Sequence, residues 1–400
     1  MKKILLSFAM LLIGVGAMAQ NAVEFTFRRN GENATVNISG AEGIEATIVA
    51  TSPSPQSNAT KVGVWNVGGA MATDTHVLCP STNTSATNAE NVITFTLTIT
   101  GLSEDFACSD ITLTNVPVNA GGNYQSGSYG EDRNCNFILN VNDENVSTID
   151  NEYIGYTNGN VANTTSFNNL KLYADNGTMT VKITLYQSRS VGSFYGLTKI
   201  VLTQPIALNV TDAGYATLYA NTNLEIPTDV EAYVVSEVNS DFATLTQVTG
   251  ILPANEGIII KASKGKYDFF QTTEDATSTI ETNYLEGSAV DFYVAGDAYV
   301  LANGTDGIGL YKATLNKNEN GGDGNTHFLN NAGKAYLPIS AFNNPAGVRF
   351  ISFDFGNETA IESVEAENEE VKTEIYDLAG RRVQNAQKGV FIVNGKVVIK

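Results

Sequence analysis

The chain has 400 residues and a formal net charge of −19 at pH 7. Its few Lys and Arg residues are not clustered, which argues against nucleic acid as a partner, because phosphate binding requires grouped basic side chains. The length allows two or three ordinary domains. Thr, Val, Ile, Tyr and Phe dominate the apolar runs, and Gly and Asn interrupt them, so we expect an all-β protein.

The N-terminus has the pattern of a signal peptide. Lys2 and Lys3 precede an apolar run that ends near Gly16, and Ala17-Met18-Ala19 follows as a small-residue cleavage site. The run is too short to span a bilayer, which takes about 20 apolar residues, and no comparable run recurs. We therefore expect residues 1–19 to be removed during export, leaving a mature chain without a transmembrane segment.

Residues 20–205 alternate as the strands of an antiparallel sandwich would. The segment Ile93–Thr100 places every apolar residue on one face and every Thr on the other, which predicts one buried and one wet face. Asn30-Gly31 and Asn176-Gly177 are predicted turns, because both residue types tolerate positive φ. The other predicted strands contain Val23, Phe25 and Phe27; Thr35 to Ile38; Phe137, Leu139 and Val141; Leu170 to Tyr173; and Val181, Ile183 and Leu185.

The segment 192–202, with the sequence GSFYGLTKIVL, resembles the final strand of galactose-binding-like jelly rolls. This is the architecture of many carbohydrate-binding modules. The resemblance implies a jelly-roll-like sandwich with a sugar ligand. It also implies that a structural calcium ion is possible, although no residue here can be assigned to it; we expect no other cofactor.

The most site-like stretch is the segment 119–133, NAGGNYQSGSYGEDR, together with a predicted partner loop at 150–169. Tyr, Ser, Gly and Asn combine rigid aromatic area with adaptable hydrogen bonding, which binding loops favour. The predicted ligand-binding residues are Tyr124, Tyr129, Asp132, Arg133, Tyr153 and Tyr156. The alternative is an ordinary extracellular loop rich in Asn and Gly. Trp65 is either a sugar platform or a half-buried core residue.

Catalytic and metal-binding patterns are poorly represented. His76 and His327 are the two histidines, and no G-x-S-x-G elbow accompanies them. A glycosidase needs two carboxylates, and the sequence points to no particular pair. An EF-hand-like run begins at Asn316 but has His327 where a bidentate Glu is required.

The three cysteines, Cys79, Cys108 and Cys135, lack zinc-site spacing. One disulfide with one spare thiol is compatible with this number, and the pairing is left open.

Residues 206–357 are expected to form a second β domain. The predicted strands include residues 214–218, 230–233, 258–260, 267–270, 298–301, 309–313, 334–337 and 350–355. The region resembles a module that recurs on Bacteroidota surface proteins ahead of a sorting tail, which implies a structural role as a spacer. The Glu-rich segment 358–373 is expected to be an acidic linker.

Residues 374–400 predict a small hairpin tail. Asn394-Gly395 separates the apolar runs Val390–Val393 and Lys396–Ile399, and Ile375–Leu378 can supply a further strand. This I-Y-D-L-x-G-R-R-V … K-G-V-F-I-V-N-G-K-V-V-I-K arrangement resembles the C-terminal sorting domains that Bacteroidota use for type IX secretion. The resemblance implies that the export machinery recognises the tail. Whether this shortened tail is a working signal is left open.

These features predict a non-catalytic protein that is secreted or displayed on the outer-membrane surface after passing through the periplasm. The expected partner is an extracellular glycan, bound by loops of the N-terminal sandwich. The first alternative is an adhesin or structural surface protein that binds host or matrix proteins. The second is a glycan-active hydrolase. Ligand identity and oligomeric state are not encoded in any recognisable motif.

Overall fold

The computed structural model is almost entirely β, as predicted. It describes residues 11–12, 22–30, 33–51, 62–66, 76–80, 93–118, 134–153, 163–187, 194–239, 241–277, 280–342, 348–355, 375–377, 390–393 and 396–399. Within these residues the one helical element is a short 3-10 turn, η1 (Ile339–Ala341). No helix in this described part is long and apolar enough to cross a membrane. The chain divides into two compact units, Met1–Asp354 and Phe355–Lys400.

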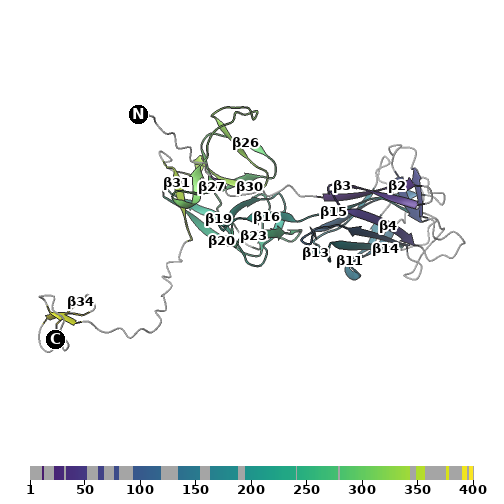
Figure 1. The fold of residues 1–400 in the computed structure, drawn as a ribbon, viewed down its shortest axis with the longest axis horizontal. Helices are drawn as coiled ribbons and strands as arrows, with labels where there is room; N and C mark the ends of the chain where they lie inside the picture. Colours follow the sequence, from purple (N-terminus) through teal and green to yellow (C-terminus); the bar gives the residue numbers. More distant parts are fainter. Residues whose placement is uncertain are drawn as a thin grey trace. The chain divides into compact units, whose positions relative to one another are not determined.

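The first unit begins with a two-sheet sandwich in which all strand pairs are antiparallel (Figure 1). The first sheet has the order β12 (Asn163–Phe167), β9 (Asp110–Val118), β15 (Phe194–Thr203), β2 (Ala22–Asn30) and β3 (Asn33–Ser39), with β6 (His76–Pro80) beside β15 and β5 (Val62–Asn66) beside β6. The second sheet has the order β11 (Glu144–Tyr153), β10 (Asn134–Val141), β14 (Thr178–Gln187), β7 (Ile93–Thr100) and β4 (Glu45–Thr51). Two short strands, β8 (Ala107–Cys108) and β13 (Leu172–Tyr173), pair with each other.

One apolar core lies between the two sheets. Phe95 and Leu97 of β7 are fully buried, as the alternation predicted. The ring of Phe137 on β10 stands edge-on to that of Phe167 on β12, with 6.4 Å between the ring centroids. Because these strands belong to different sheets, the contact shows that the sheets face each other, as in a sandwich. The prediction of a wet Thr face is wrong at Thr94, which is also buried.

The predicted turn at Asn176-Gly177 of the sandwich is confirmed. Asn176 and Gly177 have φ angles of 47° and 72°, and the flanking Asp175 and Thr178 donate backbone hydrogen bonds to each other at 2.8 and 2.9 Å. Positive φ at both central residues is what a two-residue hairpin turn requires. β2 and β3 pair from Glu24 opposite Ser39 to Asn30 opposite Asn33. The connection between them is therefore residues 31–32, so the predicted hairpin is confirmed but its predicted Asn30-Gly31 turn is wrong by one residue.

The second β region, residues 206–354, is built on a larger sheet. Its order is β17 (Tyr215–Tyr219), β22 (Gly257–Ala262), β19 (Val230–Val238), β20 (Phe242–Val248), β31 (Phe350–Asp354), β28 (Gly307–Lys312), β27 (Ala298–Gly304), β30 (Lys334–Pro338) and β25 (Glu286–Ser288), with β1 (Leu11–Leu12) beside β27. Smaller sheets pair β16 (Ile206–Val210) with β23 (Gly265–Phe269), β18 (Asn223–Glu225) with β21 (Ile251–Leu252) and β24 (Gln271–Thr272), and β26 (Phe292–Ala295) with β29 (His327–Asn330).

Most of the predicted strands of the second region are confirmed, with some omissions. The predicted strands do not include β20, although its sequence FATLTQV contains a partial apolar alternation. They also do not include β16, β18, β24, β25, β26 and β29. The pair formed by β20 and β31 is parallel, whereas the other pairs of this sheet are antiparallel. The short strand β1 lies inside the expected signal peptide, whose removal stays a prediction.

The second unit contains a three-stranded antiparallel sheet made of β32 (Ile375–Asp377), β33 (Val390–Val393) and β34 (Lys396–Ile399). Ile392 lies opposite Val397, and Val390 lies opposite Ile399. This is the register that a two-residue connection between β33 and β34 requires, so the predicted hairpin and its third strand are both confirmed. Residues 394–395 themselves lie outside the described part.

Candidate functional site

The predicted ligand-binding residues fall mostly outside the described part of the chain. Tyr124, Tyr129, Asp132, Arg133 and Tyr156 are among the residues that the structure does not describe. Tyr153 is described through its backbone, as the last residue of β11, where it pairs with Asn134. The structure therefore tests where these segments start and end, and it leaves the individual side-chain roles as predictions.

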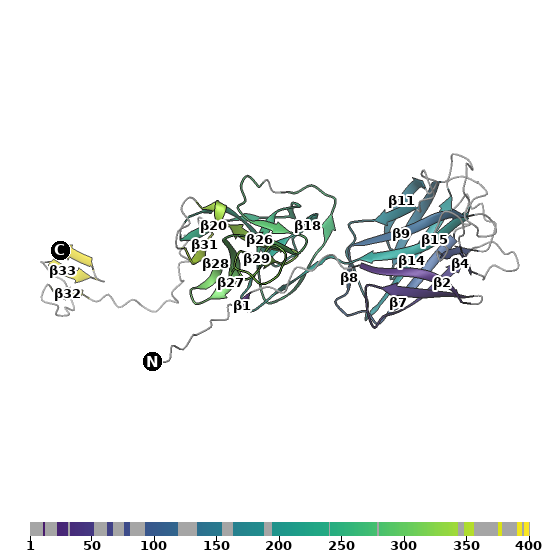
Figure 2. The same cartoon turned by 90° about the horizontal axis from the view of Figure 1, so that it is seen from above.

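The strands that flank these segments end together at one end of the sandwich. Val118 at the end of β9 pairs with Phe194 at the start of β15, and Cys135 on β10 pairs with Gln187 at the end of β14. Tyr153 joins them through its pairing with Asn134. Figure 2 shows β9 beside β15, its partner in the first sheet. We call this end, marked by Val118, Asn134, Tyr153, Gln187 and Phe194, the loop end.

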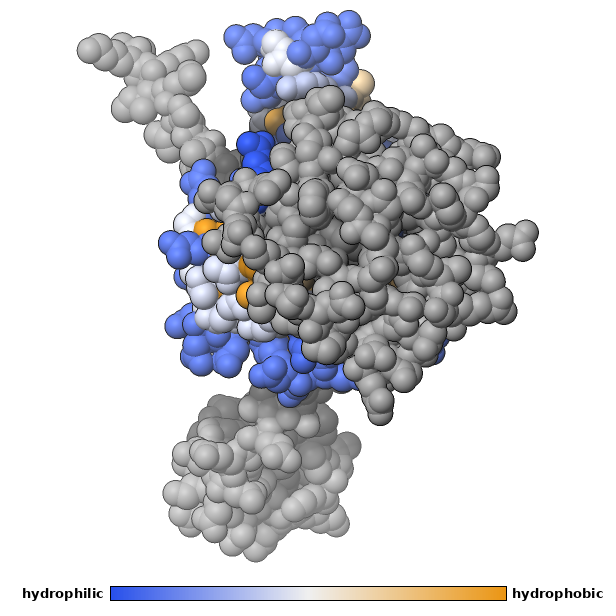
Figure 3. All heavy atoms as spheres, turned by 90° about the vertical axis from the view of Figure 1, so that its right-hand side faces the viewer, coloured by the Kyte–Doolittle hydropathy of each residue, from blue (hydrophilic) through white to orange (hydrophobic). Residues whose placement is uncertain are grey.

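Five connecting segments of six or more residues begin and end at or near the loop end. These are residues 52–61, 81–92, 119–133, 154–162 and 188–193. Thr51, before the first segment, pairs with Thr94, and Ile93, after the second, pairs with Leu185. The segment 119–133 coincides with the sequence predicted to bind ligand. Figure 3 views the molecule from the side of the loop end.

The predicted partner loop at 150–169 is wrong in its extent. Residues up to Tyr153 belong to β11, and Asn163–Phe167 form β12, so only 154–162 connects the two strands. Asn169 follows β12 at the opposite end of the sandwich, where its backbone N–H donates to the Asp110 carboxylate at 3.3 Å. β12 has the sequence NTTSF, and its run of four polar residues is also typical of turns and loops.

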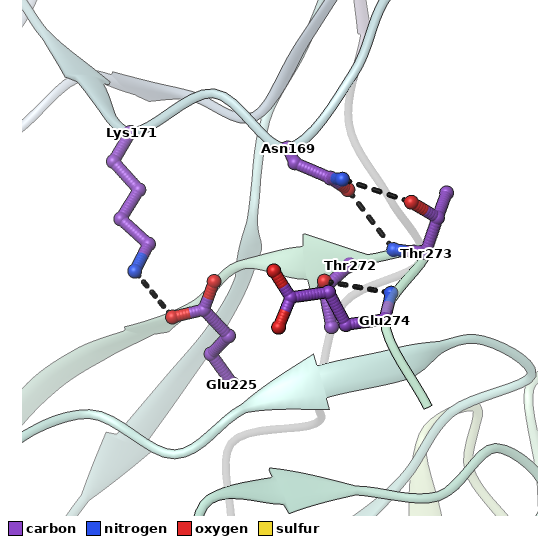
Figure 4. A network of polar contacts seen from close by, with 6 residues as sticks. All are labelled: Asn169, Lys171, Glu225, Thr272, Thr273 and Glu274. Atoms are coloured by element: carbon purple, nitrogen blue, oxygen red, sulfur yellow. Dashed lines mark hydrogen bonds and ion pairs between the residues drawn. The ribbon is translucent and has the colours of Figure 1, made fainter. Parts of the chain in front are cut away.

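A second polar cluster, which the sequence reasoning missed, joins the sandwich to the second β region (Figure 4). The Asn169 side-chain amide donates from Nδ2 to the Thr273 hydroxyl at 2.8 Å, and its Oδ1 accepts from the Thr273 backbone N–H at 3.0 Å. Lys171 forms an ion pair with Glu225. We call the set of contacts between the sandwich and the second β region the joint.

Lys266 on β23 completes the charged part of the joint. Its Nζ donates to the Asp105 carboxylate at 2.7 Å and lies 3.6 Å from Asp268. The hydrogen bond from Lys266 lowers the pKa of Asp105, whereas burial raises the pKa of Asp268 despite the same lysine. Burial alone would lower the pKa of Lys266, but its two carboxylate partners outweigh burial and raise it. The lysine therefore stays charged between two acids.

Aromatic packing accompanies these charges. The ring of Tyr173 on β13 is half-exposed and stands edge-on to Phe270, with 5.8 Å between the ring centroids. Burial and the nearby Asp268 raise the pKa of Tyr173. No local pattern could have found this cluster, because its members come from separate strands and turns of the two β regions.

The described residues show no arrangement suited to metal or thiol chemistry. No group of three His, Cys, Asp or Glu residues in the described part could hold a metal ion. Cys108 and Cys135 are both free and buried, and burial raises the pKa of each thiol to about 12. Any disulfide among the three cysteines would need one of these two, so the disulfide considered from the sequence is not formed. His327 Nδ1 lies 2.9 Å from the Thr326 hydroxyl.

Comparisons with known proteins identify no family for this chain. No family model matches it, and no curated protein matches it. Among solved structures, the adhesin domain of Epf from Streptococcus pyogenes is 10% identical and aligns over 67% of this chain and 100% of that chain, with a TM-score of 0.17. At this TM-score the likeness does not establish a shared fold.

Proposed function

We propose that the chain is an extracellular, non-catalytic binding protein that holds a glycan in the segments of its loop end. The observation that supports this is the strand register, which brings the ends of five connecting segments to the same end of the sandwich. Segments that leave and return to one end can together form one binding surface on a rigid scaffold. The opposite end of the sandwich carries the joint, so the two ends have different roles.

The composition of 119–133 favours a sugar among extracellular ligands. Tyr124 and Tyr129 supply aromatic rings on which a pyranose can stack, and Asp132 and Arg133 supply hydrogen-bonding groups for its hydroxyls. Tyr153 places a third tyrosine at the end of β11, next to the same segments. The second hypothesis is that the same surface binds a protein ligand, as in an adhesin. The third is that the chain is a glycan-active hydrolase.

The binding test uses the mature chain, residues 20–400, on a glycan array. The matched variants are the double change Tyr124→Ala with Tyr129→Ala and the control Tyr284→Ala, which removes a half-exposed tyrosine from the second β region. We expect the wild type and the control to bind the same glycans, and the double variant to lose at least tenfold in affinity.

Two results would overturn the glycan proposal. A blank array together with capture of an extracellular matrix protein would favour the adhesin reading. Release of new reducing ends from polysaccharide pools would favour the hydrolase reading. Equal glycan binding by the wild type and the double variant would remove these tyrosines from the site.

We also propose that the C-terminal sheet of the second unit serves export. Its three strands and their register match the hairpin pattern on which the sorting-domain resemblance depends. Deleting residues 374–400 is expected to leave the protein in the periplasm, as measured by cell fractionation and surface proteolysis. Normal surface display of the truncated chain would contradict the proposal.

A further inference from the structure

The covalent link between the sandwich and the second β region is very short. Thr203 ends β15, Ile206 begins β16, and Gln204 and Pro205 lie between them. Pro205 is buried, and proline restricts its own backbone. A short link keeps the two β regions at high effective concentration, so weak contacts across the joint are enough to hold them together.

Charged contacts make up much of the joint. Lys171 pairs with Glu225, and Lys266 pairs with Asp105, each pair joining the sandwich to the second β region. Their side chains are substantially exposed, at 54% and 34% for the first pair and 35% and 62% for the second. Exposed ion pairs are individually weak and are screened by dissolved salt.

The uncharged contacts of the joint respond differently to salt. The two hydrogen bonds between Asn169 and Thr273 and the ring contact between Tyr173 and Phe270 carry no net charge. Salt at moderate concentration therefore weakens the ion pairs selectively. The strand pairing gives no further support, because in the described residues no strand of the sandwich pairs with a strand of the second β region.

We propose that the joint is an electrostatic latch, made of the ion pairs Lys171–Glu225 and Lys266–Asp105, that locks the sandwich to the second β region at low ionic strength and loosens as ionic strength rises. The latch sets the direction in which the loop end points relative to the second β region. It acts whether or not the loop end binds a glycan, since its contacts lie at the other end of the sandwich.

The test is single-molecule energy transfer on the mature chain. Click-reactive amino acids replace the exposed residues Asp150 on β11 and Glu237 on β19 and carry the two dyes. We expect one narrow distribution of transfer efficiency at about 0.05 M NaCl, and a broader or shifted distribution at about 1 M, where the Debye length falls to about 3 Å.

Charge variants identify the source of the salt response. The double change Lys171→Gln with Lys266→Gln is expected to broaden the distribution at low salt and to abolish any further response to salt. The charge reversal Lys171→Glu with Glu225→Lys, made in the wild-type chain, keeps an ion pair between the two positions. We expect it to retain the narrow, salt-sensitive distribution of the wild type. Lys264→Gln is the matched control, because Lys264 pairs with Asp212 at 3.0 Å within the second β region; it should behave like the wild type.

The proposal fails if the wild-type distribution is the same at both salt concentrations. It also fails if the double glutamine variant matches the wild type at low salt, or if the control variant loosens the joint equally. Circular dichroism of each variant verifies that the β structure is retained, so that a broadened distribution reports the joint rather than unfolding.

Discussion

The sandwich and the second β region differ in how far their buried polar side chains have hydrogen-bond partners. The sandwich encloses one continuous apolar core between two sheets, with Phe95 and Phe137 fully buried. In the second region Lys334 and Gln271 are buried with no hydrogen-bond partner for their side-chain polar atoms among the described residues. Buried polar groups without partners are costly. In the sandwich, Asn115 is also buried with an unpaired Oδ1, but its Nδ2 donates to the Thr165 hydroxyl at 3.1 Å. Among the described residues, the larger cost of unpaired buried polar groups therefore falls on the second region.

The largest expected loss comes from the sandwich core. Phe137→Ala removes a fully buried ring that packs edge-on against Phe167. We expect a loss of about 3–5 kcal/mol in the free energy of unfolding, measured by urea denaturation of residues 20–400. The control Val49→Ala, on an exposed position of the same sandwich, should change it by less than about 0.5 kcal/mol. Equal effects of the two variants would show that the core is not the main support of the sandwich.

The largest expected gain in the free energy of unfolding comes from a substitution in the second β region. Burial lowers the pKa of Lys334 from 10.5 to about 8, which corresponds to roughly 3 kcal/mol of destabilisation near neutral pH. Lys334→Met keeps the volume and removes the charge, so it should stabilise by up to about this amount.

The pH dependence of this gain follows from the sign of the shift. Below pH 8 the folded state bears the full cost of the buried ammonium, and the cost disappears as pH rises from about 8 towards 10.5. The stabilisation by Lys334→Met should therefore be largest near pH 7 and vanish near pH 10.5. Denaturant titrations at several pH values measure it, and a gain independent of pH would contradict the assignment.

An intermediate effect is expected at a turn of the sandwich. Gly101 has φ of +78°, and a Cβ there would lie 2.7 Å from the Gly43 carbonyl oxygen. Gly101→Ala should cost about 1–3 kcal/mol, from backbone strain together with this clash. Gly43 is the matched control, since it has φ of +74° with nothing within 4 Å of a Cβ. If Gly43→Ala lowers the melting temperature as much as Gly101→Ala does, the clash with the Gly43 carbonyl oxygen does not contribute to the loss.

The smallest expected signal is thiol reactivity in the sandwich. Cys108 and Cys135 are buried with pKa values raised to about 12, so a maleimide at pH 7 should leave both unlabelled in the native protein. Peptide mass spectrometry locates any label. Both thiols should be labelled only when the sandwich unfolds. Because both lie in the sandwich, the labelling then measures unfolding of the sandwich separately from unfolding of the second β region. Rapid native labelling of either thiol would show that the core opens readily.

Much of the local structure could be predicted from particular residues. Phe95, Leu97 and Ile99 alternate with threonines, and such a period of two places them on one buried face whatever the partner strands are. Asn176-Gly177 predicts its turn from backbone sterics alone. The candidate site could be predicted from the sequence only in part. The segment 119–133 could be recognised by its composition. The limits of its partner segment could not, because they depend on the pairing of β12 with a strand that is distant in the sequence.

The sequence by itself determined that this chain is all-β, where many of its strands run, and which face of those strands carries the apolar side chains, because alternation and turn chemistry act within a few residues. Only the tertiary structure decided that β15 lies between β9 and β2, that five connections share the loop end, and that Lys171 meets Glu225 across the joint. Those outcomes depend on pairings between residues far apart in the chain, and such pairings leave no periodic trace in the sequence.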